Sequence, residues 1–239
     1  MKQRHLPSGV ILKAGSALLL GISMSACASL SGFGGTSWKE EALLHDGSKI
    51  VVERSVERGG RHEIGQPPPI NEQRLSFSLP GAHQIIKWED HHSEDLGSAN
   101  FLPLLVDVVD GIPYVVASPA GCLSYNKWGR PNPPYVVFRF KDKKWARIPL
   151  HDLPTVIQRP NLIFSSPDIE AAKIGLRTIS AEKIRDILDG YRQPAYRTIL
   201  REPIKPGAGA SSVNCPDYSS PRLMNFKAPN PVLPPATGK

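Results

Sequence analysis

The sequence lacks an apolar run long enough to cross a bilayer. The apolar stretch from Ala14 to Met24 is far shorter than the roughly 20 residues that a membrane-spanning helix needs. No run of Lys and Arg reaches the length of a nucleic-acid-binding patch, although the formal net charge is +7. We therefore expect neither a membrane-spanning helix nor nucleic acid as a partner.

The sequence also lacks the short motifs of the common hydrolases. There is no G-x-S-x-G, and His62-Glu63 is followed by Gln66 where a zinc protease has its second histidine. His91 and His92 stand among acidic residues, but neighbours on an extended segment point to opposite faces and would not share one metal ion. No catalytic residue, metal site or cofactor is predicted.

The N-terminus has the three parts of an export signal. The first thirteen residues contain basic but no acidic side chains, residues 14–24 are apolar, and the two residues before Cys27 are small. We predict that residues 1–26 are a signal peptide. The Gly- and Ser-rich residues 27–37 are expected to be a flexible tether.

The junction Met24-Ser25-Ala26-Cys27 resembles the lipobox of bacterial lipoproteins, with Met24 where that motif usually has Leu. The resemblance implies that Cys27 becomes the lipid-carrying first residue of the mature protein. Several acyl chains would then hold the protein to a membrane. Ala28 after the cysteine favours the outer membrane, so the predicted location is the cell envelope, facing the periplasm.

Only three cysteines are present, and lipidation of Cys27 leaves Cys122 and Cys215. Disulfides form and persist in exported compartments, so we predict a bond between these two residues. The alternatives are a nucleophilic thiol at Cys122 and two unrelated buried thiols.

From Trp38 to Phe164 short strands alternate with turn signals. Asp46-Gly47 and Asp110-Gly111 mark two hairpins, and the charged residues 141–144 mark a third. The pattern predicts a mainly β fold, an antiparallel meander that forms a sandwich or barrel-like sheet pair over residues 38–164.

The pattern changes after Ser165. Short helices are expected at 167–174 and 181–188, and a last short strand at 196–200. The remainder is rich in Pro and Gly and is expected to be irregular. We predict that residues 165–239 are a helical and irregular extension packed on the β domain.

The segment 120–135 is the richest candidate for binding. Tyr125, Trp128 and Arg130 are of the residue types that dominate binding hot spots, and we consider them an exposed or half-exposed surface. The competing interpretation is a long connection braced by the disulfide, with Trp128 in the core. A second polar segment, Arg58 to Pro69, is explained as a Gly-rich turn leading into polyproline.

The segments HDG (45–47), GGRHEIGQ (59–66) and CLSYNKWGRPNPPY (122–135) resemble parts of uncharacterised proteobacterial lipoproteins. That resemblance implies the compartment and no mechanism. The leading hypothesis is a non-enzymatic, lipid-anchored envelope protein that binds another envelope protein or a glycan. The alternative is an envelope hydrolase that uses a carboxylate or Cys122. The two hypotheses differ in whether the polar groups of 58–66 and 120–132 share one cleft.

Overall fold

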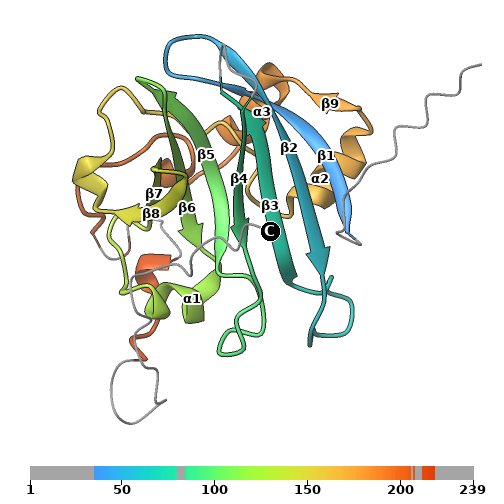
Figure 1. Ribbon diagram of the computed structural model, residues 1–239. Helices are drawn as coiled ribbons and strands as arrows, with labels where there is room; N and C mark the ends of the chain where they lie inside the picture. The colour runs from blue at the N-terminus through green and yellow to red at the C-terminus, as the bar shows by residue number, and fades with distance from the viewer. Residues whose placement is uncertain (1–34, 80–83, 206, 208–211, 219–239) are drawn as a thin grey trace, which may run out of the picture. The chain divides into compact units, whose positions relative to one another are not determined.

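A computed structural model describes residues 35–79, 84–205, 207 and 212–218 (Figure 1). Cys27, the predicted signal peptide and the Pro-rich residues 219–239 lie outside these ranges. Within them, no helix is both long and apolar enough to cross a membrane. The fold is mainly β, as predicted, with nine strands in two sheets and three α-helices in the described part of the chain.

The first sheet has the order β4-β3-β2-β1-β9. Its members are β1 (Thr36–Leu43), β2 (Lys49–Arg58), β3 (Ile70–Ser78), β4 (Ile85–Asp90) and the two-residue β9 (Thr178–Ile179). The first four strands follow one another in antiparallel pairs, whereas β9 adds to β1 in parallel. Along β2, buried and exposed residues alternate, because successive side chains of a strand point to opposite faces.

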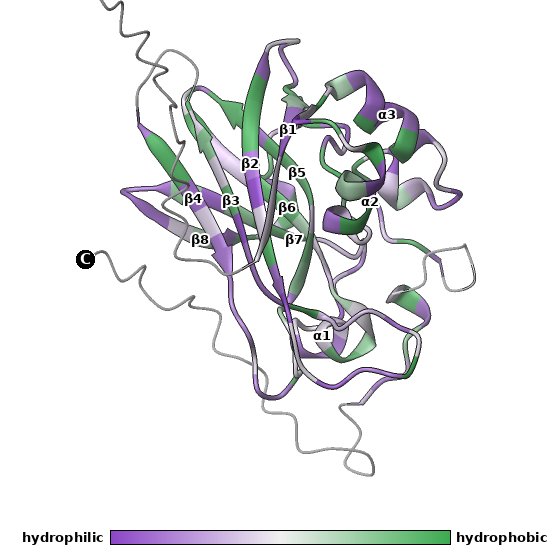
Figure 2. Ribbon diagram, turned by 90° about the vertical axis from the view of Figure 1, so that its right-hand side faces the viewer, coloured by the Kyte–Doolittle hydropathy of each residue, from purple (hydrophilic) through white to green (hydrophobic). Residues whose placement is uncertain are grey.

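The second sheet is an antiparallel meander in the order β5-β6-β7-β8. It consists of β5 (Phe101–Val109), β6 (Ile112–Pro119), β7 (Val136–Lys141) and β8 (Lys144–Ile148). Most of β5 and β6 is buried on both faces. In Figure 2 these two strands are accordingly green over most of their length.

The two sheets pack face to face as a sandwich. Val52 and Leu75 of the first sheet share a core with Val106 and Phe138 of the second. Trp88 of β4 lies 5.6 Å, between ring centroids, from Phe138 of β7. The opposite face of the second sheet packs against residues from the segment after β8, which explains why its strands are continuous apolar runs.

The helices are α1 (Gly121–Lys127), α2 (Pro167–Ile174) and α3 (Ala181–Asp189), and short 3₁₀ turns lie at Leu150–Asp152, Pro194–Tyr196 and Ser212–Asn214. Helices α2 and α3 form where predicted and contact β1, while α1 lies at the other end of the sandwich (Figure 2). Ser180 begins α3, since its side chain accepts a hydrogen bond from the backbone N–H of Lys183.

Three local expectations were wrong. The predicted strand at 196–200 is absent from the described residues, where Pro194 instead starts a 3₁₀ turn. Residues 121–127, which lie in the segment interpreted as a binding surface or a long connection, form α1. Strand β1 begins at Thr36, so the first sheet starts inside the segment predicted as a tether.

Candidate functional site

Cys122 at the start of α1 is bonded to Cys215, as predicted. The two sulfur atoms lie 2.03 Å apart and the Cα atoms 5.3 Å apart. Cys122 is therefore not available as a free thiol nucleophile, which removes one form of the hydrolase hypothesis.

The prediction of an exposed binding surface at Tyr125 and Trp128 was wrong. Tyr125 is 2% exposed and Trp128 is 7% exposed. The Trp128 ring lies 4.6 Å from that of Phe101, and its Nε1 donates a hydrogen bond to Asn100 Oδ1 at 3.2 Å. Because the segment folds as a helix followed by a tight turn, these rings point inward and complete the core at this end of the sandwich.

The guanidinium group of Arg130 forms hydrogen bonds with residues 215–216. Its Nη2 donates to the Cys215 carbonyl and its Nη1 to the Pro216 carbonyl, each at 2.9 Å. Asn126 on α1 also donates to Pro216 at 2.9 Å. The region 122–130 therefore holds residues 215–216 in place next to the disulfide, which is a structural role.

The second polar segment, Arg58 to Pro69, also has a structural role. Arg58 forms two hydrogen bonds of 2.7 Å with the Asp168 carboxylate and a third with the Pro68 carbonyl. Segment 58–66 lines neither of the cavities described below. His91, from the acidic segment, pairs with Glu72 at 2.6 Å. The described residues contain no group of three or more potential metal ligands.

A cavity of about 280 Å³ lies beside the turn between β1 and β2. We call it the hairpin cavity. Four parts of the chain line it: the end of β1 with the turn that follows, Asp107 of β5, the segment 156–161, and α3 with Arg197 beyond it. Its volume is at the lower end of the range for small-molecule sites, so it would take one small ligand or one unit of a larger ligand.

The lining of the hairpin cavity includes a His–Asp pair. His45 Nδ1 lies 2.8 Å from Asp107 Oδ1, and the backbone N–H of His45 donates to Oδ2 at 3.1 Å. The N–H of Val108 also donates to Asp107 Oδ1, at 2.7 Å. When the carboxyl is ionised it can only accept, so Nδ1 carries the proton and Nε2 is left for a ligand or a substrate.

Burial governs the electrostatics of this pair. The side chain of Asp107 is 3% exposed and that of His45 is 19% exposed. Burial raises the pKa of Asp107 above its ordinary value, although the hydrogen bonds from His45 and Val108 partly offset the effect. Perturbed titratable groups in a cavity are typical of functional sites, and structural buried ion pairs shift pKa values in the same way.

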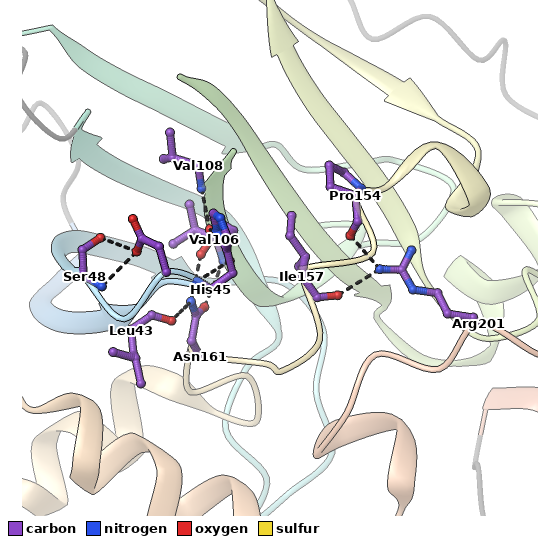
Figure 3. A network of polar contacts seen from close by, with 11 residues as sticks. Leu43, His45, Ser48, Val106, Val108, Pro154, Ile157, Asn161 and Arg201 are labelled. Atoms are coloured by element: carbon purple, nitrogen blue, oxygen red, sulfur yellow. Dashed lines mark hydrogen bonds and ion pairs between the residues drawn. The ribbon is translucent and has the colours of Figure 1, made fainter. Parts of the chain in front are cut away.

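The segment 156–161 forms one wall of the hairpin cavity, and hydrogen bonds fix it at its start and at its end (Figure 3). Asn161 donates to the carbonyls of Leu43 and Val106 and accepts from the Val106 N–H, so it joins this wall to β1 and β5. Arg201 donates to the carbonyls of Pro154 and Ile157, each at 2.9 Å. A wall fixed in this way loses little conformational entropy when a ligand binds.

A second, more open cavity of about 420 Å³ is lined by the turn 131–133 and the end of β8. Its polar groups are already engaged. Tyr135 donates to the Ala195 carbonyl at 2.8 Å, and Arg147 lies over the Trp128 ring. Asn132 exchanges two hydrogen bonds with the backbone of Ile204. The hairpin cavity is therefore the stronger candidate.

Sequence reasoning missed His45 and Asp107. His45 directly precedes the turn signal Asp46-Gly47, and Asp107 lies within the apolar run Leu104 to Val109, whose pattern predicts a buried strand. The available signal was the single carboxylate in that apolar run, since a buried charge needs a partner. The identity of the partner, 62 residues away, follows only from the pairing of the sheets.

No protein-family model, no curated protein and no solved structure matches the chain.

Proposed function

We propose that the chain is a lipid-anchored protein of the bacterial cell envelope whose β-sandwich binds another envelope component in the hairpin cavity. The observation that carries the binding proposal is a preformed cavity whose lining includes a His–Asp pair and a wall fixed by Asn161 and Arg201. Such a cavity orients a ligand without requiring a rearrangement of the chain.

The proposed location rests on two features. The sequence at 24–27 resembles a lipobox, and Cys122 is bonded to Cys215 in a manner suited to an oxidising compartment. The outer membrane, facing the periplasm, is the location that Ala28 favours.

The experiment has two parts. Metabolic labelling with a palmitate analogue should mark the wild-type chain and should fail with Cys27→Ala. Photo-crosslinking from a probe placed at Val156, an exposed residue on the cavity wall, should capture an envelope component. A probe at Leu176, exposed and outside the cavity lining, is the control. Labelling that persists in Cys27→Ala, or crosslinks of equal yield at both positions, would refute the proposal.

Hydrolysis is a second candidate, favoured by the same pair. A carboxylate that accepts from Nδ1 leaves Nε2 as a base that can take a proton from water. Hydrolysis of an envelope glycan should then be lost in His45→Asn and kept in His151→Asn, whose side chain is 83% exposed. Hydrolysis at equal rates in both variants would exclude this candidate.

A further inference from the structure

The charged side chains that line the hairpin cavity indicate the chemical class of its ligand. Arg159, Arg185 and Arg197 line it from three different parts of the chain. Within the described residues, their guanidinium groups make no hydrogen bond and no ion pair. Arginines elsewhere in the fold serve as structural donors, such as Arg58 to Asp168 and Arg201 to Pro154.

Most of the negative charge at the cavity is already compensated. Glu41 lies 3.5 Å from Lys49 and also accepts from the backbone N–H of Ala181. Asp107 accepts from the ring and the backbone of His45 and from a backbone N–H of β5. Only Asp189 lacks a partner within the described residues. The lining therefore offers three free cations against one free carboxylate.

This imbalance favours a ligand that carries an anionic oxygen group. A guanidinium presents several N–H donors in a planar fork that suits carboxylate and phosphate. Asp189 lies one helical turn after Arg185, so the two side chains are neighbours on α3. A ligand hydroxyl group next to the anionic group could therefore donate a hydrogen bond to the Asp189 carboxylate. A volume of about 280 Å³ suits one sugar unit.

We propose that the hairpin cavity binds an acidic sugar, with Arg159, Arg185 and Arg197 holding its carboxylate or phosphate. The inference rests on the proposed function and specifies the ligand class. A uronic acid of a polysaccharide and a phosphosugar of a lipid headgroup share this chemistry. His45 Nε2 and the Asp189 carboxylate would contact the hydroxyl groups of the ring.

The test is titration calorimetry on the full mature chain in detergent micelles. The probes are glucuronate, glucose 6-phosphate and uncharged glucose. We expect at least one acidic probe to bind about tenfold or more tightly than glucose, since hydrogen bonds to charged groups are the stronger ones. Preference for glucuronate would indicate a polysaccharide source, and preference for glucose 6-phosphate a phosphosugar source.

The double variant Arg185→Gln/Arg197→Gln should weaken binding of the acidic probe about tenfold, with an unchanged melting temperature. Arg192→Gln, an exposed residue outside the cavity lining, is the matched control and should bind as the wild type does. The inference is overturned if neither acidic probe binds, if glucose binds equally well, or if the double variant keeps wild-type affinity.

Failure of this inference can be distinguished from failure of the proposed function. If the crosslink from Val156 survives in the arginine double variant, the cavity binds an envelope component of another chemistry. If the wild-type chain gives no crosslink from that position, the proposed function itself is wrong.

Discussion

Arg54 on β2 donates from Nη1 to Glu40 Oε1 on the neighbouring β1 at 2.9 Å, and both side chains are at most 1% exposed. Glu40 also accepts from Trp38 Nε1 at 2.6 Å and from the backbone N–H of Ile163 at 3.0 Å. Arg54 donates in turn to the Ile163 carbonyl. The pair joins the first sheet to the segment that covers it.

Removing one member of this pair should destabilise the protein strongly. Glu40→Leu leaves the Arg54 cation buried without its carboxylate, and we expect the free energy of unfolding to fall by about 3–5 kcal/mol. The double variant Glu40→Leu/Arg54→Met removes both charges and should recover part of this loss. Urea unfolding measures both variants, and a double variant less stable than Glu40→Leu would contradict this account.

Trp128→Ala should lower stability because the ring is part of the core. Truncation of a buried aromatic side chain costs about 3–5 kcal/mol. It would also remove the hydrogen bond to Asn100 and the packing on Phe101. Thermal unfolding gives the measurement, and Ile64→Ala, at a fully exposed side chain, is the control. If Trp128→Ala has the melting temperature of the wild type, packing at this end of the core contributes little to stability.

Replacing Cys122 and Cys215 together with Ser should cost about 4.6 kcal/mol in the chain-entropy model, since the bond closes a loop with a sequence separation of 93. Hydrogen exchange at residues 212–218 should also become faster. Reduction of the wild-type protein should reproduce both effects. Exchange that stays slow after reduction would mean that Arg130 and Asn126 hold this segment without the bond.

The ion pair between Arg58 and Asp168 should contribute to acid unfolding. Burial disfavours the charged carboxyl, but the hydrogen bonds and charge of Arg58 outweigh it and hold the pKa of Asp168 below its ordinary value of 3.8. Below that pH the unfolded chain takes up the proton first, so lowering the pH removes stability until the folded carboxyl titrates.

The corresponding measurement is the free energy of unfolding against pH. Asp168→Asn should be less stable than the wild type near neutral pH, and its curve should fall less steeply below about pH 4. Asp142→Asn, in the exposed turn between β7 and β8, should keep the wild-type slope. Parallel curves for the wild type and Asp168→Asn would contradict the assignment.

Most strands were predictable from the local sequence. Alternating apolar residues indicate burial of one face of a strand, and a continuous apolar run indicates burial of both faces. The hairpins around Asp46-Gly47 and Asp110-Gly111 follow from turn chemistry. Helix α1 was not predictable in this way. Its seven residues gain their stability from packing against β6 and from the disulfide, which are contacts with distant parts of the chain.

The candidate site was predictable only in part. The disulfide follows from the cysteine count and the predicted compartment, whereas the residue types of Tyr125 and Trp128 suit both binding and core packing and so do not decide between surface and core. His45 and Asp107 become neighbours only when the first hairpin meets β5. Propensity within a short window carries no information on such a contact.

The parallel pairing of Lys39 with Thr178 sets the order in which the chain can complete its first sheet. Strand β9 lies far after β1 in the chain, so Lys39 and Glu40 stay without this partner until the C-terminal segment folds back onto β1. An open strand edge is a template for pairing with other chains. A chain truncated before Thr178 cannot form this pairing and should therefore aggregate more readily than the full chain, through the part of β1 that stays open.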